Sequence, residues 1–168
     1  MSQKIADSVR DRCKVIAVSD AFKLAPWADA LVSQDRSWWR VHTEQSMKFE
    51  GRKFTGSDFP DVEKVQFEGG INTGSNSGLL AMWVAVKVFD AKRLLLLGFD
   101  MGGSHFFGPH PEPLKNTQPR RFEAFQEQFA RFRPRGVEIV NCTVGSHLRA
   151  YKKGNLEDCL AQSETSTV

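Results

Sequence analysis

The amino-acid sequence predicts a single-domain α/β protein, built on a doubly wound, mostly parallel sheet with helices on both faces. Short apolar runs alternate along the chain with segments of helical pattern, an order typical of this class. One run, Arg93–Gly98 (RLLLLG), shows no alternation of polar residues, as in a parallel strand covered on both faces. The 168 residues suffice for one domain with a core and are few for two. We expect the domain to span residues 1–162, followed by a flexible tail over residues 163–168.

In the first half of the chain, the pattern predicts a helix followed by four short strands. Residues 2–12 have a helical pattern. Lys14–Val18 and Ala30–Gln34 are apolar runs bounded by polar residues, which predicts buried strands. Weaker strand patterns follow at Gly51–Thr55 and Glu63–Phe67.

The second half is predicted to alternate helices with strands. Ser75–Asp90 is expected to be a helix, and its stretch Leu79–Val86 is apolar on nearly every face, which predicts that it is buried against the sheet. The strand Arg93–Gly98 comes next, and Thr117–Arg133 then has the phenylalanine spacing of an amphipathic helix. A last strand at Val137–Val140 and a short helix at Leu156–Leu160 complete the pattern.

Composition and charge narrow the classes of partner. A net charge of +3 is too small to argue for nucleic acid, which stays an open alternative. Several basic residues gather late in the chain and indicate either a solvated surface or a phosphate-facing patch: Arg120, Arg121, Arg131, Arg133, Arg135, Arg149, Lys152 and Lys153. No apolar run approaches the roughly 20 residues of a membrane span, and the N-terminus lacks a signal-peptide core.

The cysteines and histidines predict neither a disulfide framework nor a metal site. Cys13, Cys142 and Cys159 are odd in number and widely spaced, which favours a reducing compartment. The four histidines lack the spacing of zinc ligands. We therefore expect a cytoplasmic protein without a zinc site.

Polar residues follow the predicted strands at the sheet edge where α/β proteins bind ligands, beyond the carboxyl ends of the strands. They are Ser19 and Asp20 after the first strand, Asp35 after the second, Asp100 after the leucine strand and Asn141 after the last. Gly102 and Gly103 form a glycine loop just after Asp100. An aspartate at a strand end also commonly caps the next turn. For Asp20 and Asp35, such a structural role is the alternative to ligand binding. Trp27, Trp38 and Trp39 are expected in the core, with stacking on a base as the alternative.

The segment 69–78 (GGINTGSNSG) precedes the buried helix and predicts an anion site. Its glycines allow backbone N–H groups to approach a phosphate, and the helix N-terminus adds partial positive charge. The predicted nucleotide-binding residues of this segment are Asn72, Thr73, Gly74, Ser75, Asn76 and Ser77. Those predicted at the strand ends are Ser19, Asp20, Gly102, Gly103 and Asn141. Neither a Walker loop nor a Gly-x-Gly-x-x-Gly pattern is present, so glycines used only for close strand–helix packing are the alternative.

His105 is the candidate general base, with Asp100 and Asp35 as the other catalytic candidates. His105 and His110 lie within six residues, after a glycine loop at the carboxyl end of a strand. Asp35 and Asp100 could position an acceptor hydroxyl or Mg²⁺, since hard cations prefer carboxylate oxygens. An ordinary surface position is the alternative for a loop histidine.

Four segments carry a resemblance that covers about Asp11 to Leu160: VIAVSDAFKLAPWADALVSQDRSWW, INTGSNSGLLAMWVAVKVFDAKRLLLLGFDM, SHFFGPHPEPLKN and VEIVNCTVGSHL. They resemble a family of small phage and prophage proteins. That family is similar to the Rossmann-like domain of motility accessory factors and archaeal 6-hydroxymethylpterin pyrophosphokinases, and more distantly to bacterial sialyltransferases that use a CMP-sugar donor. The resemblance implies that Asn72–Gly78 faces the nucleotide, that Gly98–Met101 opens into the site, and that Asp35 occupies a polar position. It also makes His105 the counterpart of a catalytic histidine.

The function that the resemblance implies is a nucleotide-dependent transferase of glycosyl or diphosphate groups, in the cytoplasm of a bacterial host cell. A non-catalytic nucleotide-binding or interaction protein is the alternative, and a nucleic-acid-modifying accessory protein rests on the basic cluster alone. The ligand would be a nucleotide or nucleotide sugar; Mg²⁺ and homo-oligomers are left open.

One departure from the resembled proteins concerns the first strand. They begin with a strand and a Gly-Pro-Ser-Leu loop, placed before the helix that here opens the chain. Either that loop has been lost or the sequence given starts late. Because loss of a central strand would leave two apolar edges unpaired, we predict that Lys14–Val18 pairs directly and in parallel with Arg93–Gly98.

Overall fold

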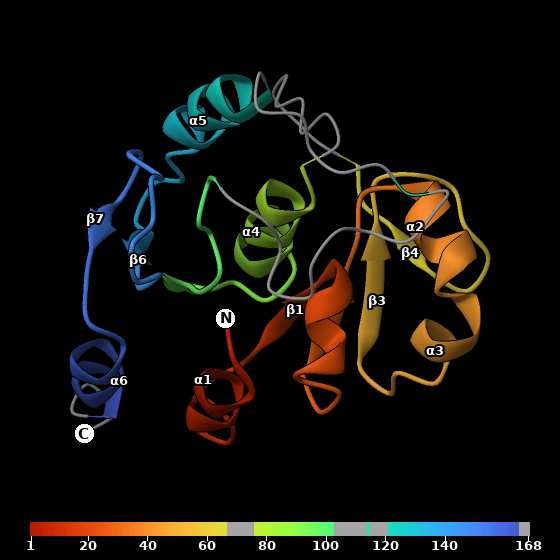
Figure 1. Ribbon diagram of the computed structural model, residues 1–168, viewed down its shortest axis with the longest axis horizontal. Helices are drawn as coiled ribbons and strands as arrows, with labels where there is room; N and C mark the ends of the chain where they lie inside the picture. Colours follow the sequence, from red (N-terminus) through yellow and green to blue (C-terminus); the bar gives the residue numbers. More distant parts are fainter. Residues whose placement is uncertain (67–75, 103–113, 115–120, 165–168) are drawn as a thin grey trace.

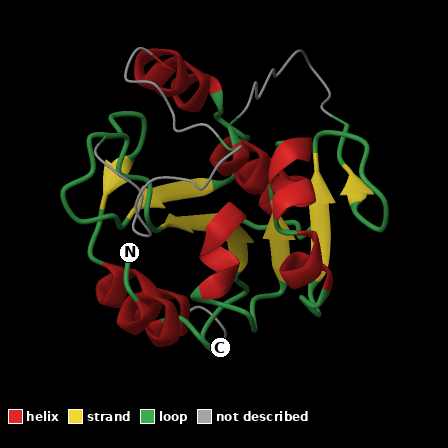
Figure 2. Ribbon diagram, turned by 45° about the vertical axis from the view of Figure 1, so that its right-hand side comes forward, coloured by secondary structure: helices red, strands yellow, loops and turns green. Residues whose placement is uncertain are grey.

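The computed structural model describes residues 1–66, 76–102, 114 and 121–164, and it has the α/β architecture that the sequence predicts (Figures 1 and 2). Its elements, in chain order, are α1 (Gln3–Ser8), β1 (Ile16–Val18), the 3-10 helix η1 (Ser19–Lys23), β2 (Ala30–Val32), α2 (Arg36–Val41), α3 (Thr43–Met47), β3 (Arg52–Thr55), β4 (Glu63–Lys64), α4 (Ser77–Lys87), β5 (Arg93–Leu96), α5 (Arg121–Arg131), β6 (Glu138–Asn141), β7 (Lys152–Lys153) and α6 (Leu156–Glu164). Within the described residues, every helix is too short or too polar to cross a membrane.

The strands form two sheets in which every pairing is parallel. The first sheet has the order β1-β2-β3-β4, and the second has the order β5-β6-β7. Ala17 pairs with Leu31 in the first sheet, and Leu94 pairs with Ile139 in the second. Parallel strands joined through helices confirm the predicted class.

Helix α4 lies between the two sheets and packs on both. Its residues from Leu79 to Ala85 are all buried, as the apolar pattern predicts. On one side, Leu80 and Val84 join a cluster with β2 and β3 of the first sheet. On the other side, Leu79, Met82 and Trp83 join a cluster with β5 and β6 of the second sheet. A single helix therefore holds both sheets through two different apolar sides.

The strands of the two sheets also run in the same direction, as contacts at the amino end of α4 show. The hydroxyl of Ser77 accepts a hydrogen bond at 3.0 Å from the backbone N–H of Gln34, which follows β2. Gly78 lies against the ring of Phe99, which follows β5, so closely that an added Cβ would be 2.9 Å from Cε1. Carboxyl ends from both sheets therefore meet at one end of the helix.

The predicted direct pairing of Lys14–Val18 with Arg93–Gly98 is wrong. Among the described strands, β1 pairs only with β2, and β5 pairs only with β6. The two strands do not pair because each sheet packs against a different side of α4. Ile16 of β1 reaches the clusters on both sides, yet the backbones stay unpaired.

The faces of the sheets opposite α4 are covered by other helices. Trp38 and Trp39 of α2 are 3% and 0% exposed and pack with Leu31 and Phe22 over the first sheet, so the tryptophans belong to the core. In the second sheet, Leu95 and Val140 pack against α6.

None of the cysteines in the described part of the chain is in a disulfide bond, and Cys142 and Cys159 are buried where α6 packs on the second sheet. Burial, together with the neighbouring Cys159, raises the pKa of Cys142 to about 12. The Cys142 thiol is therefore uncharged at neutral pH.

Candidate functional site

The candidate site is the edge of the two sheets where the strands end. The structure describes eight of the residues predicted there: Ser19, Asp20, Asp35, Asn76, Ser77, Asp100, Gly102 and Asn141. The predicted residues Asn72, Thr73, Gly74, Ser75, Gly103 and His105 lie outside the described residues.

Hydroxyl groups from three elements line the first-sheet part of this edge. Ser19 follows β1 with a φ of 47°, a conformation uncommon for residues other than glycine. Its hydroxyl lies 3.1 Å from the hydroxyl of Ser33, which follows β2. Next along the chain, Gln34 bonds to Ser77 of α4. The predicted residues Ser19 and Ser77 therefore lie at the same edge, linked through the end of β2.

Asp20 is turned into the protein and is 1% exposed. Its carboxylate accepts hydrogen bonds from Trp38 Nε1 at 2.9 Å and from Lys23 Nζ at 2.5 Å. Burial alone would raise the pKa of Asp20, but the bonds from Lys23 and Trp38 and the nearby His42 outweigh it and hold the pKa below its usual range. Any contact between Asp20 and a ligand would have to replace these partners, so its observed role is to tie η1 to α2.

His42 completes this buried cluster. Its Nε2 lies 3.6 Å from Asp20 Oδ1 and has no hydrogen-bond partner among the described residues, and the residue is 7% exposed. Burial lowers the pKa of His42, while the charge of Asp20 acts in the opposite direction. The centres of the His42 and Trp38 rings are 4.7 Å apart, with their planes tilted by 38°. The histidine is thus a neutral core residue.

Asn76 and Asp35 lie beside α5 as well as at the sheet edge. Asn76 is buried and caps α4, because its Oδ1 accepts from the backbone N–H of Leu79 at 3.0 Å. Its Nδ2 donates to Gln128 of α5 at 3.3 Å. Asp35 keeps contact with solvent, yet partial desolvation raises its pKa, against the opposing charge of Arg121 at the start of α5.

The second-sheet part of the edge is held by a turn that follows β6. The side chain of Asn141 accepts from the N–H of Thr143 at 3.0 Å and donates to the hydroxyl of Ser146 at 2.8 Å. That hydroxyl donates to the carbonyl of Phe99 after β5 at 2.6 Å. Asn141, 1% exposed, therefore shapes the turn and joins the ends of the two strands.

This turn places His147 beside the loop that follows β5. The N–H of His147 donates to the carbonyl of Asp100 at 2.8 Å, and Gly102 lies so close that an added Cβ would be 3.4 Å from the histidine ring. The side chain of Asp100 is exposed. The predicted residues Asp100 and Gly102 thus share their surroundings with a histidine that the sequence analysis did not select.

An open cavity of about 500 Å³ lies at this place, between the second sheet and α5. Residues that line it include Met101, Glu123, Gln126, His147, Arg149 and Lys153. Arg149 pairs with Glu123 at 2.9 Å, and Lys153 donates to the carbonyl of Ser146. Two cations and one carboxylate make the wall net positive at neutral pH.

Sequence reasoning missed His147, Arg149 and Lys153 as members of the site. A signal was present, since Gly145 follows the last predicted strand and adopts a φ of 70°, which marks a tight turn at the carboxyl edge. Arg149 and Lys153 were noted only as part of a basic cluster. The cavity shows that these two cations, together with His147, share one wall.

No group of three metal-ligating side chains that could hold an ion occurs within the described ranges. Comparisons with known proteins do not assign this chain to a family. No protein-family model, no curated protein and no solved structure matches the chain.

Proposed function

We propose that this protein binds a nucleotide-type phosphorylated small molecule at the carboxyl edge of its strands and uses it in a transferase reaction. The observation that carries the proposal is the convergence of strand ends from both sheets on the amino end of α4, through Ser77 and Gly78. Ligands of parallel α/β sheets bind at such edges, and a helix N-terminus favours anions.

The charge of the neighbouring cavity supports the choice of an anionic ligand. Arg149, Lys153 and the ring of His147 offer donors to phosphate oxygens, whereas Glu123 is the one carboxylate among the residues that line the cavity. A volume of about 500 Å³ lies within the range of small-molecule sites.

The proposed reaction is transfer of a glycosyl or diphosphate group, with a histidine as general base. His105 is the candidate from the sequence, and His147 is a second candidate from the geometry. Asp100 would orient the acceptor hydroxyl or a Mg²⁺ ion.

A binding protein without catalysis is the second candidate function. Asp20, Asn76 and Asn141 are engaged in hydrogen bonds within the protein, which favours structural roles for them. Under this alternative the ligand site would remain and no variant would show turnover.

Thermal denaturation with nucleoside mono-, di- and triphosphates and nucleotide sugars, with and without Mg²⁺, tests the binding. A ligand at about one hundred times its dissociation constant should stabilise the fold by roughly 2.7 kcal/mol. Asn76→Asp keeps a good helix cap but adds negative charge, so it should reduce the shift, whereas the neutral cap Asn76→Ser should retain more of it. If every nucleotide leaves the denaturation midpoint unchanged, both candidate functions fail.

Turnover by the wild type separates the two candidate functions. If a histidine is the base, His105→Ala or His147→Gln should lower turnover by about 10²–10⁴ and leave nucleotide affinity within a few fold. Binding without turnover in wild type and variants would select the binding protein.

A further inference from the structure

An ion pair joins α5 to the segment after β6 at the cavity between them. Arg149 donates from Nη2 to Oε2 of Glu123 in α5 at 2.9 Å, and both residues line the cavity. Their side chains are 71% and 78% exposed. Because water competes for both charges, an ion pair this exposed contributes little to stability. The guanidinium of Arg149 is therefore bound to a partner that another anion can replace.

The backbone beside Arg149 is held by contacts that do not involve this ion pair. Gln126 of α5 donates from Nε2 to the carbonyl of His147 at 2.7 Å and accepts from the N–H of Arg149 at 3.1 Å. The hydroxyl of Tyr151 donates to a backbone carbonyl of α5 at 2.8 Å. The side chains of Glu123 and Arg149 can therefore separate while α5 and the segment after β6 stay together.

Two further donors line the cavity with Arg149. Lys153 Nζ donates to the carbonyl of Ser146, a neutral group that does not cancel the charge of the lysine. His147 is exposed, so its ring is accessible to a ligand. Among the described residues that line the cavity, Glu123 is the one carboxylate, and it faces the arginine. Replacement of Glu123 by a phosphate group would bring the anion next to all three donors.

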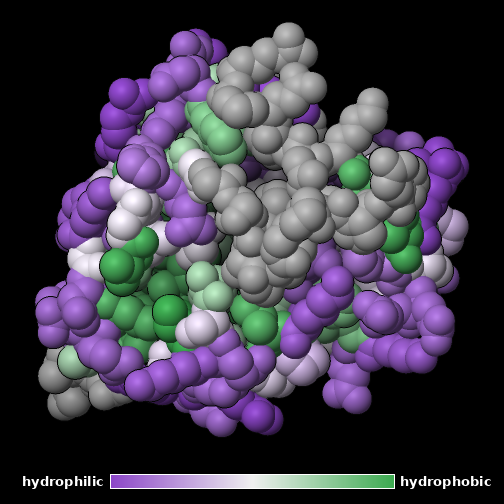
Figure 3. All heavy atoms as spheres, in the orientation of Figure 1, coloured by the Kyte–Doolittle hydropathy of each residue, from purple (hydrophilic) through white to green (hydrophobic). Residues whose placement is uncertain are grey.

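The surroundings of the cavity suit a charged ligand. Figure 3 shows mostly hydrophilic residues at the upper left, where Figure 1 places α5 and β7. An open, hydrophilic site spares a phosphate group the cost of complete removal from water. The cavity also adjoins the amino end of α4, since Ser146 donates to the carbonyl of Phe99, whose ring lies against Gly78.

We propose that Glu123 competes with a phosphate group of the ligand for Arg149, and so sets the affinity of the cavity. The inference rests on the proposed function, because it names the cavity as a phosphate subsite of the same edge. A phosphate monoester has a charge of about −1.5 to −2 at pH 7 and three acceptor oxygens, whereas a carboxylate has one charge and two oxygens. Arginine binds either group through parallel N–H bonds. The phosphate displaces Glu123 and is bound by Arg149, Lys153 and the ring of His147.

Isothermal titration with inorganic pyrophosphate at constant ionic strength tests the competition. We expect Glu123→Gln to bind pyrophosphate about two- to fivefold more tightly than the wild type, because an exposed ion pair no longer has to be broken. Arg149→Ala should weaken binding at least about tenfold. Arg149→Lys keeps the charge but loses the parallel donors, so its affinity should lie between these values. The exposed positions of both side chains should leave the thermal midpoints of all three variants close to that of the wild type.

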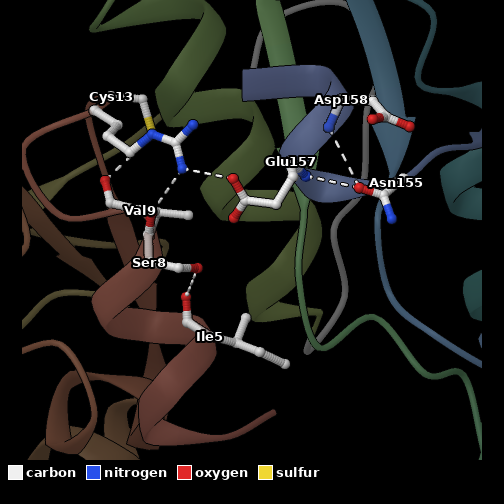
Figure 4. A network of polar contacts seen from close by, with 8 residues as sticks. Ile5, Ser8, Val9, Cys13, Asn155, Glu157 and Asp158 are labelled. Atoms are coloured by element: carbon white, nitrogen blue, oxygen red, sulfur yellow. Dashed lines mark hydrogen bonds and ion pairs between the residues drawn. The ribbon is translucent and has the colours of Figure 1, made fainter. Parts of the chain in front are cut away.

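Two matched variants distinguish this competition from a general change in charge. Glu127→Gln removes the same charge one turn along α5, from a carboxylate that lies 3.5 Å from Arg131. Glu157→Gln removes the carboxylate that accepts from Arg12 at 2.8 Å, in the contact between α6 and the segment after α1 (Figure 4). Neither glutamate is among the described residues that line the cavity. Both variants should therefore bind pyrophosphate within about 1.5-fold of the wild type, since salt screens distant charges.

Equal gains in affinity for Glu123→Gln and Glu127→Gln, no effect of Arg149→Ala, or no binding of pyrophosphate to wild type and Glu123→Gln would overturn the proposal. The proposed function survives these results if nucleotides still raise the denaturation midpoint, whereas the failure of every nucleotide rejects both. A nucleotide that displaces pyrophosphate supports the proposal with the nucleotide's own phosphate in the cavity. Binding of both together supports it with free diphosphate there.

Discussion

Replacement of Asp20 by alanine tests whether the buried carboxylate holds η1 and α2 together. The variant leaves Trp38 Nε1, now bonded at 2.9 Å, without an acceptor inside the protein. An unsatisfied buried donor costs about 1–3 kcal/mol. Lys23 adds little to this cost because its side chain is 43% exposed and can be hydrated. We therefore expect Asp20→Ala to lower the free energy of unfolding by about 2–3 kcal/mol at pH 7.

Urea unfolding followed by tryptophan fluorescence measures this loss, with two matched variants. Asp20→Asn retains an acceptor for Trp38 and should lose about 1 kcal/mol. Lys23→Ala removes the partly exposed partner and should lose less than about 1 kcal/mol. The reasoning is refuted if Asp20→Ala stays within about 0.5 kcal/mol of wild type, which is the scatter of neutral surface changes. A loss for Lys23→Ala as large as that for Asp20→Ala would also refute it.

Three further variants probe the fold. Burial lowers the pKa of His42, so as the pH falls the unfolded chain binds a proton that the folded chain does not. The free energy of unfolding should therefore be highest above about pH 6.5 and decrease below it. His42→Leu should weaken this pH dependence, as measured by urea unfolding between pH 7 and pH 5. Asn76→Ala should cost about 1 kcal/mol through loss of the α4 cap, and an unchanged urea midpoint would contradict the role of the cap. Gly154→Ala should cost about 1–3 kcal/mol, because its Cβ would lie 2.7 Å from Val140 Cγ1 and 3.1 Å from Cys159 Sγ; an equal thermal midpoint would contradict the close packing.

Elements with a strong local pattern could be predicted from the sequence. The apolar run of Leu79–Val86 and the leucines of β5 identify a buried helix and a parallel strand, and both are found where their patterns lie. Helices α2 and α3 were not predicted, since Arg36–Met47 mixes tryptophans with polar residues and its burial depends on Phe22 and Leu31, distant in sequence. Strand β7 has only two lysines, and pairing with β6 rather than local pattern creates it.

The sequence allowed the location of the site at the carboxyl edge of the strands to be predicted, but not the contacts that its side chains make. Reading the ends of the strands selected Ser19 and Asp100, and the glycine-rich segment selected Ser77; the structure has all three at the carboxyl edge of the strands. It could not distinguish a side chain that faces solvent from one like Asp20, because burial depends on where Trp38 lies. His147 was missed because a turn of six residues after β6, closed by Asn141, brings it to Asp100.

The dependence of both sheets on α4 has a consequence for synthesis on the ribosome. A nascent chain that has emerged to residue 66 contains β1–β4, but Val32 and Phe54 of these strands lack the helix that covers them. Once α4 emerges, β5 follows directly, yet its partner β6 comes only after α5 has been made. At about 5–20 residues per second, β5 waits on the order of seconds for that partner. During this interval the leucines of β5 lack the strand with which they pair.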